Sequence, residues 1–135
     1  MLGEMLGELN GKIISQRIVS HHEGGKVKFE RTMETKGKIL GQDVTFIATF
    51  WQMERPQGGM FAKGHGVLMT KDGGKAIVRG AGVSVSSKGA GWSSRGSRYA
   101  QTTVPALKKL NEAALVFELE ISPDGTVKDK WYEWK

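Results

Sequence analysis

The sequence has no cysteine and no long hydrophobic run. Disulfide bonds, thiolate catalysis and cysteine-ligated zinc sites are therefore excluded for its 135 residues. No apolar stretch approaches the ~20 residues of a membrane-spanning helix. The first nine residues carry two acids and no basic residue, unlike a secretory signal. We expect a cytoplasmic protein with no membrane partner.

Acidic residues are fewer than basic ones, 14 against 20, and the net charge is +6. Such a charge permits contact with polyanions. The lysines, however, are scattered along alternating positions, and no block of five or six like charges occurs. Solubility is the favoured explanation of the charge, and we do not expect nucleic acid as a partner.

Glycine is abundant, and many of the 19 glycines lie in residues 61–99. Asp72-Gly73-Gly74, between the apolar runs Met60–Lys71 and Lys75–Lys88, is typical of a hairpin turn. Glycines inside those runs favour strands that bend sharply, as at a barrel corner. A phosphate cradle would need a helix start after the glycines, whereas Val67–Thr70 favours a strand.

Alternating polarity predicts strands along the chain, as where Arg31 shares a face with Phe29 and Met33. The predicted strands are Lys12–Val19, Lys26–Lys36, Asp43–Met53, Met60–Lys71, Lys75–Lys88, Trp92–Val104, Ala113–Ile121 and Thr126–Trp134. Pro105–Asn111 predicts one short helical turn. The first ten residues are compatible with a helical turn or a loose arm.

Short connections without a crossover helix predict an antiparallel meander. Eight such strands tend to close, because closure removes both edges of the sheet. We therefore predict an all-β fold, an eight-stranded antiparallel up-and-down barrel made by residues 1–135 as a single domain. A flattened sandwich is the alternative.

Glycine placements and turns also carry a resemblance to known proteins. The positions are Gly64-His65-Gly66, Asp72-Gly73-Gly74, Gly80-Ala81-Gly82, Arg95-Gly96, Leu110-Asn111 and Trp131–Trp134. They resemble small bacterial and archaeal proteins of unknown function with a calycin-like barrel similar to allene oxide cyclase. For that family the resemblance implies ring closure of a fatty-acid epoxide in an apolar cavity, often in a trimer. It supports the barrel and leaves the activity open.

A barrel of this size is either filled or holds one small ligand, so inward polar residues are the candidate site. Asp129 alternates with lysines and is expected inside. The predicted ligand-binding residues are Arg31, His65, Arg79, Tyr99, Trp131 and Glu133. They either pair with one another, for example Arg31 with Glu133, or form a polar lining that orients a ligand.

Signals for catalysis and metal binding are weak. His65 is the one histidine inside a predicted strand and has no evident acid-base partner. His21 and His22 stand beside Glu23 at a turn, and adjacent strand residues point to opposite faces. No serine has the Gly-x-Ser-x-Gly setting. We expect neither a metal nor a cofactor.

Three functions follow, in order of preference. The first is a barrel that binds a small, largely apolar ligand in its interior. The second, which rests on the resemblance, is an isomerase or cyclase acting in the cavity. The third is a nucleic-acid-binding protein with a basic surface, in which Trp92, Tyr132 and Trp134 stack on bases.

A homo-oligomer, dimer or trimer, is expected from Asp43–Met53, which is apolar on both faces. One face must point out of the barrel, and Ile47 and Trp51 would then form part of an exposed patch that self-association covers. In the alternative, the N-terminal arm with Leu2, Met5, Leu6 and Leu9 folds back over Trp51.

Overall fold

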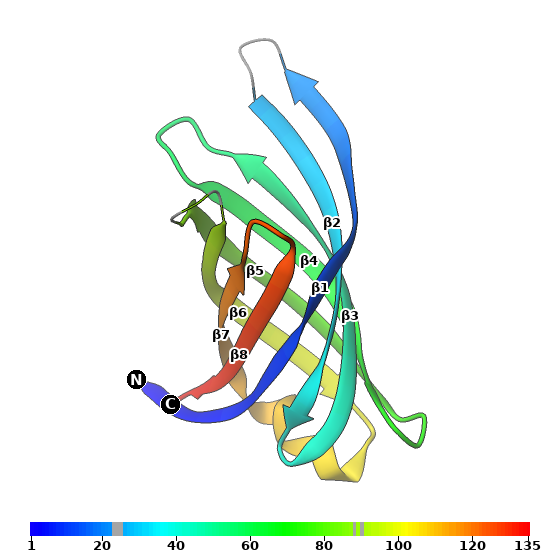
Figure 1. Cartoon of the computed structure of the whole chain (residues 1–135). Coiled ribbons are helices and arrows are strands. Elements are labelled where there is room, and N and C mark those ends of the chain that lie inside the picture. Colours follow the sequence, from blue (N-terminus) through cyan, green and yellow to red (C-terminus); the bar gives the residue numbers. More distant parts are fainter. Residues whose placement is uncertain (23–25, 88, 90) are drawn as a thin grey trace.

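The computed structural model is a closed barrel of eight antiparallel strands that neighbour one another in chain order, which confirms the predicted fold (Figure 1). It describes residues 1–22, 26–87, 89 and 91–135. The elements are β1 (Leu2–His22), β2 (Lys26–Ile39), β3 (Gln42–Glu54), β4 (Met60–Thr70), β5 (Lys75–Ser86), β6 (Trp92–Thr102), the 3₁₀ helix η2 (Pro105–Glu112), β7 (Ala114–Ile121) and β8 (Thr126–Trp134). Within the described chain no helix has the length and apolarity needed to cross a membrane.

The first ten residues belong to strand β1, which corrects the expected helical turn or loose arm. Gly7 pairs with Ile39 of β2 and with Trp131 of β8, and Leu6 and Leu9 are buried in the barrel. Two register irregularities, between Leu2 and Met5 and between Met5 and Gly7, interrupt the alternation. They hide the period of two that identifies a strand in a sequence.

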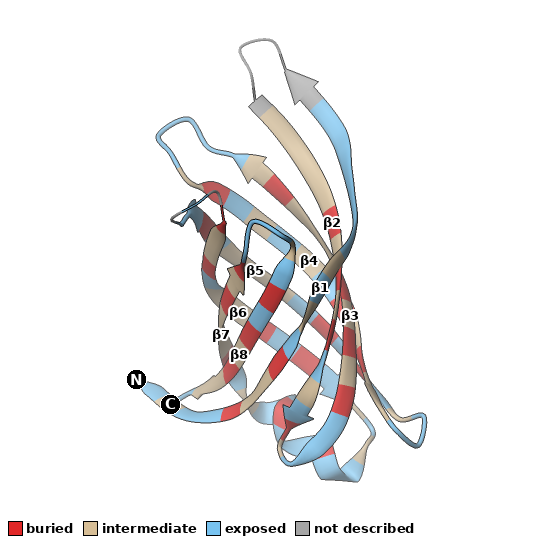
Figure 2. Ribbon diagram, viewed as in Figure 1, coloured by how far each residue is buried: buried red, intermediate tan, exposed pale blue. Residues whose placement is uncertain are grey.

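The two faces of β3 differ in burial, and both carry apolar side chains, as the sequence predicted. Val44, Phe46 and Ala48 are buried inside, while Ile47 and Trp51 lie on the outer face and are half-buried (Figure 2). The N-terminal segment does not cover this outer face, because β1 is bonded into the sheet and β2 separates it from β3.

The two ends of the barrel differ. Helix η2 lies at one end, where its Leu107 and Leu110 are fully buried. At the other end the β1–β2 and β3–β4 hairpins extend beyond the β7–β8 hairpin (Figure 1). The register of β1 with β8 stops at Lys12, so the described part of β1 after that point pairs with β2 alone.

One wall of the barrel has few inward side chains. Its inner positions on β4, β5 and β6 include five glycines, called here the glycine wall: Gly64, Gly66, Gly80, Gly82 and Gly96. A Cβ atom on Gly66 would lie 2.6 Å from the carbonyl oxygen of Ile47, and one on Gly80 would lie 2.9 Å from that of Ser97. Neighbouring backbones thus approach too closely for any side chain.

We predict that Gly66→Ala lowers the free energy of unfolding by about 1–3 kcal/mol, because the added methyl group is forced against the backbone of β3. Urea unfolding of the full chain measures the change. Ala81→Ser, on the outer face nearby, is the matched control and should stay within about 0.5 kcal/mol of the parent protein. Equal stabilities for the two variants would show that β3 and β4 relax freely at Gly66.

Candidate ligand-binding cavity

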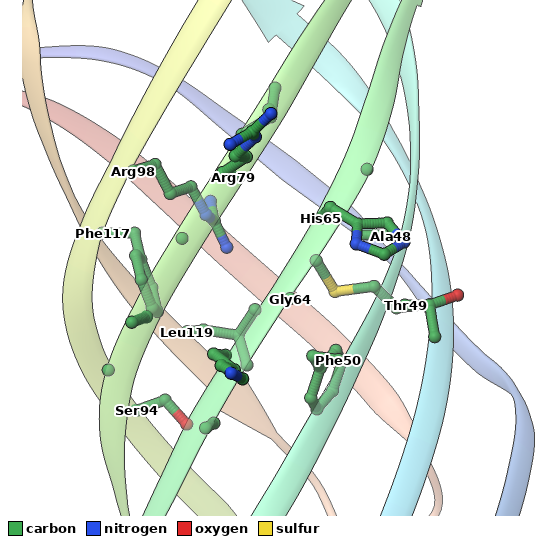
Figure 3. Close-up of a pocket in the computed structure, with 18 of the residues that line it drawn as sticks. Ala48, Thr49, Phe50, Gly64, His65, Arg79, Ser94, Arg98, Phe117 and Leu119 are labelled. Carbon is green, nitrogen blue, oxygen red and sulfur yellow. The ribbon is translucent and has the colours of Figure 1, made fainter.

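A cavity of about 70 Å³ lies inside the barrel against the glycine wall. Apolar side chains from β2, β3 and β7 also line it, among them Met33, Phe46, Phe50, Phe117 and Leu119. Figure 3 shows Phe50, Phe117 and Leu119 beside Gly64. A water molecule takes up roughly 30 Å³ of liquid, and benzene fits an apolar cavity of roughly 150 Å³. The space as it stands therefore suits a very small apolar group, and a larger ligand would have to displace a side chain.

Three polar side chains from adjoining strands form a short chain of hydrogen bonds beside this cavity. The hydroxyl groups of Ser84 and Ser94 lie 2.6 Å apart, and both residues line the cavity. Gln52 Nε2 donates to Ser84 Oγ at 3.4 Å. Gln52 is fully buried, and its Oε1 has no hydrogen-bond partner among the described residues. The inner surface therefore keeps unused hydrogen-bonding capacity next to the cavity.

The central charged group of the interior is the ion pair between Arg98 and Asp129. Arg98 Nη1 donates to both carboxylate oxygens of Asp129, at 2.9 and 2.8 Å. Trp131 Nε1 donates to Asp129 Oδ2 at 3.0 Å. Burial raises the pKa of the Asp129 carboxyl, and the charge of Arg98 and these hydrogen bonds oppose that rise. Each charge thus depends on the other for its place inside the barrel.

Aromatic rings surround the guanidinium group of Arg98. Its central carbon lies 4.1 Å from the ring centre of Phe117, 4.8 Å from that of Trp131 and 5.5 Å from that of Phe46. The faces of such rings attract cations. Because Arg98 borders the cavity, the ion pair contributes a fixed dipole to one side of an otherwise apolar space.

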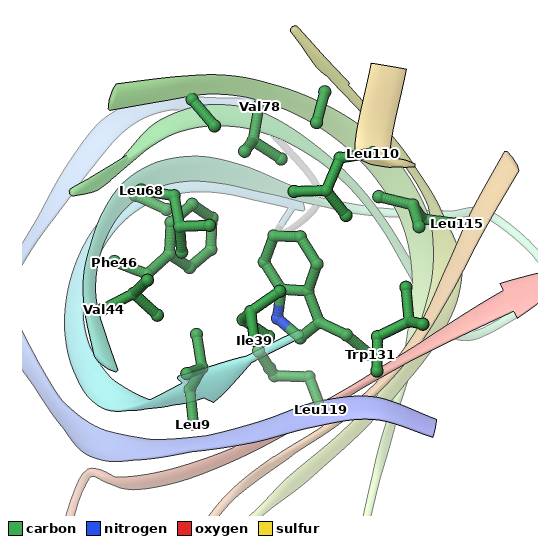
Figure 4. Close-up of a cluster of buried hydrophobic side chains, with 14 of the residues drawn as sticks. Leu9, Ile39, Val44, Phe46, Leu68, Val78, Leu110, Leu115, Leu119 and Trp131 are labelled. Carbon is green, nitrogen blue, oxygen red and sulfur yellow. The ribbon is translucent and has the colours of Figure 1, made fainter. Parts of the chain in front are cut away.

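The barrel is filled on the η2 side of this ion pair. Trp131 is completely buried at its centre, with Leu110, Leu115 and Ile39 around it (Figure 4). The rings of Trp131 and Phe46 meet edge to face at 5.3 Å. Buried side chains therefore close this end of the barrel.

Arg31 and Trp131 lie inside the barrel as the sequence predicted, but the expected ion pair between Arg31 and Glu133 is wrong. Glu133 Oε1 lies 3.4 Å from the Nζ atom of Lys109. Arg31 pairs in register with Gln16, far along β1 from the residues that meet β8. The two side chains therefore belong to opposite ends of the barrel.

By strand alternation the side chains of His65, Arg79 and Tyr99 lie on the outer face, which corrects their predicted place in the interior, although His65 and Arg79 are still among the residues that line the cavity. His65 stands opposite Arg79 in the register, and Arg79 stands opposite Tyr99, so the three form one row across β4, β5 and β6. Tyr99 is 62% exposed. The orientation was misjudged because glycines, which add little hydrophobicity, occupy the inward positions, while residues such as Ile77 give the outer face the apolar character of a core.

Arg98, Gln52, Ser84 and Ser94 were not predicted as site residues. The alternation of Arg98 with Gly96 and Ala100 was a usable signal, because small residues at every second position mark the inner face of a tightly bent strand. Asp129, by contrast, was correctly expected inside.

Two further expectations concern metals and base stacking. The side chains of His21 and His22, and all of Glu23, lie outside the described residues. The part of the chain that the structure describes holds no cluster of three or more metal-ligating side chains. Trp92 is partly buried against the core, whereas Trp134 is exposed.

Comparison with known proteins identifies proteins of similar fold but assigns no activity to this chain. The chain matches no protein-family model, and no curated protein is detectably similar in sequence. It is similar in structure to a protein of unknown function from Clostridium acetobutylicum, with a TM-score of 0.81 and 13% identity over 98% of both chains. It is also similar to a protein of unknown function from Rhodopseudomonas palustris, with a TM-score of 0.78 and 16% identity over 99% of both chains.

Another similar structure is that of a protein from Penicillium herquei described as an enzyme. Its TM-score is 0.67, with 15% identity over 97% of this chain and 92% of that one. At such identities the likeness shows the barrel alone.

We predict that Asp129→Asn lowers the free energy of unfolding by about 3–5 kcal/mol, because it leaves the charge of Arg98 buried without a counter-ion. The double variant Arg98→Met, Asp129→Leu should recover most of that loss, since no unpaired charge is left. Urea unfolding of both variants gives the comparison. If the double variant is no more stable than Asp129→Asn, the pair is not the coupled unit described above.

Proposed function

We propose that this protein is a small barrel that binds a small, largely apolar ligand in its interior. The observation that carries the proposal is the cavity between the glycine wall and the rings of Phe50 and Phe117. Binding pockets are typically apolar with a few fixed polar groups, and here Ser84, Ser94 and Arg98 supply those groups.

A second candidate is an enzyme of isomerase or cyclase type that acts on a ligand in the same cavity. Two observations favour it. A structurally similar chain is titled an enzyme, and an ionisable side chain, Arg98, reaches the cavity with a partner whose pKa is perturbed, Asp129. The likeness to allene oxide cyclase rests on the sequence resemblance only, so binding without catalysis is the preferred function.

Binding can be tested with small neutral probes. We expect 1-propanol and 1-butanol to shift the backbone amide NMR signals of the glycine wall, because these alcohols can place a short alkyl chain in the cavity. Ala62→Val adds two methyl groups at the cavity wall and should reduce these shifts at least about tenfold at equal probe concentration, since ~1.4 kcal/mol of lost affinity is a factor of ten.

The matched control is Ala114→Val, which adds the same groups at an exposed position at the start of β7. It should leave the probe response unchanged. Signals of the glycine wall that do not move with either alcohol, or that move equally in Ala62→Val, would contradict interior binding.

A further inference from the structure

Arg31 is a buried cation for which the described chain supplies no counter-ion. Its side chain points into the barrel and only 8% of the residue is exposed. No carboxylate of the described residues forms an ion pair with it, and its Nε has no hydrogen-bond partner there. Among the described residues, the ring of Phe29 is near it: the ring centre lies 5.4 Å from the guanidinium carbon of Arg31. Burial lowers the pKa of Arg31, which reflects the cost of holding its charge inside.

The two interior arginines therefore differ in kind. Arg98 is neutralised by Asp129 and held among three rings. Arg31 has neither a carboxylate nor a full set of hydrogen bonds from the described residues. A buried cation without a counter-ion lowers the stability of the folded chain. An anion that binds beside Arg31 would therefore offset this cost.

Gln52, another residue with a buried polar atom that has no hydrogen-bond partner among the described residues, is close to Arg31 in the sheet. Arg31 pairs in register with Phe50, and Gln52 follows two residues later on the same face of β3. Diagonal neighbours of this kind are roughly 7–8 Å apart and within reach of long side chains. Phe50 and Met33, which flank Arg31 on the inner face, also line the cavity. Arg31 and Gln52 do not themselves line the cavity, but both lie beside residues that do.

We infer that the ligand is a small monocarboxylic acid with a short apolar body, whose carboxylate binds Arg31 and whose body enters the cavity. The inference rests on the proposed function and adds the chemical class of the ligand. The guanidinium group donates to the carboxylate, as arginine commonly does. Gln52 can donate a further hydrogen bond to the carboxylate when its amide group is turned over, so that Nε2 takes the place of Oε1 and Oε1 accepts from the hydroxyl group of Ser84. The small volume of the cavity excludes a long acyl chain.

The test compares acids with their neutral amides. Propionate and butyrate are titrated into the full chain, and propionamide and butyramide serve as matched controls, with binding followed by calorimetry and NMR. Each acid should bind at least tenfold more tightly than its amide, and Arg31→Met should remove that preference. Glu30→Gln, one residue away on the outer face, should leave the preference intact.

Thermal unfolding separates a ligand-binding role of Arg31 from a structural one. Because Arg31 lacks a partner, Arg31→Met should leave Tm unchanged or raise it. A Tm several degrees lower would mean that the folded chain itself needs the charge, and would overturn the inference. If amides and acids bind equally, the carboxylate assignment fails while the proposed function stands. If none of the four probes nor the alcohols binds, the proposed function fails too.

A second and independent observation is the outer face of β3, β4 and β5. Its exposed or half-buried residues are largely apolar and are called here the outer patch: Ile47, Trp51, Met53, Phe61, Val67, Met69, Ile77, Val83 and Val85, joined by Lys63, His65 and Arg79 and by Tyr99 of β6. Ile77 is 49% exposed and Val85 is 52% exposed. A shallow depression lies between His65, Val67, Ile77 and Arg79.

The composition of the outer patch is that of a protein interface. Aromatic residues, methionine and arginine are enriched at interfaces, and acidic residues are depleted. The patch contains no acid. Across β3, β4 and β5, three strands about 4.8 Å apart and about eight residues of about 3.3 Å each give roughly 380 Å². A standard interface buries about 800 Å² of each partner, so the outer patch would form the apolar centre of a contact with a second copy and not the whole of it.

We propose that the outer patch is the contact surface of a two-fold homodimer. A second copy is the favoured occupant because an isologous contact matches an apolar patch with the same apolar patch. Each chain carries a net charge of +6, so the two copies repel at low ionic strength. An apolar contact under such repulsion becomes tighter as salt is added. A contact with an acidic partner protein would become weaker.

Sedimentation equilibrium of the full chain at tens of micromolar tests this proposal. We expect a dimer whose dissociation constant falls when NaCl rises from about 50 to about 500 mM, because salt screens the repulsion. Ile77→Glu should weaken the dimer at least tenfold. Ile18→Glu, at an equally apolar and exposed position on β1, is the control and should not. A monomer throughout, or an assembly disrupted by Ile18→Glu and not by Ile77→Glu, would overturn the proposal.

Discussion

The close approach of neighbouring strand backbones along β4, β5 and β6 is the constraint on which the rest of the barrel depends. Added Cβ atoms at Gly66, Gly80 or Gly82 would meet the backbone of the adjoining strand within 3 Å. The strands can bend and close there only because these positions are glycine. The same absence of side chains leaves space inside, so one local requirement of the fold also produces the cavity.

The interior is organised by how its charges are satisfied. Arg98 and Asp129 neutralise each other between the cavity and the filled end around Trp131. Arg31, nearer the open end, has no such partner among the described residues. We infer from this difference that Arg31 attracts an anion, and that the adjacent apolar space limits which anions fit.

The sequence was sufficient for the barrel, for seven of the eight strands along most of their lengths and for the outward apolar face of β3. It was insufficient where side chains carry no hydrophobic signal. Irregular register masked the strand character of residues 2–10. Glycine at inward positions reversed the apparent faces of β4 and β5, so His65 and Arg79 were placed inside. Which buried charges pair depends on strand register, which no single sequence displays, so the pairing of Arg98 with Asp129 was not predictable, although the alternation of Arg98 with Gly96 and Ala100 indicated its inward position.

The most direct measurement of the central claim, that the glycine wall leaves an accessible apolar space, is a crystal structure under xenon pressure. Xenon occupies dry apolar cavities without needing any polar contact. We expect a xenon atom beside Gly80, between the rings of Phe50 and Phe117. A barrel in which the side chains of Met33 and Phe50 fill that position, with no xenon there at any pressure that the crystal tolerates, would contradict it.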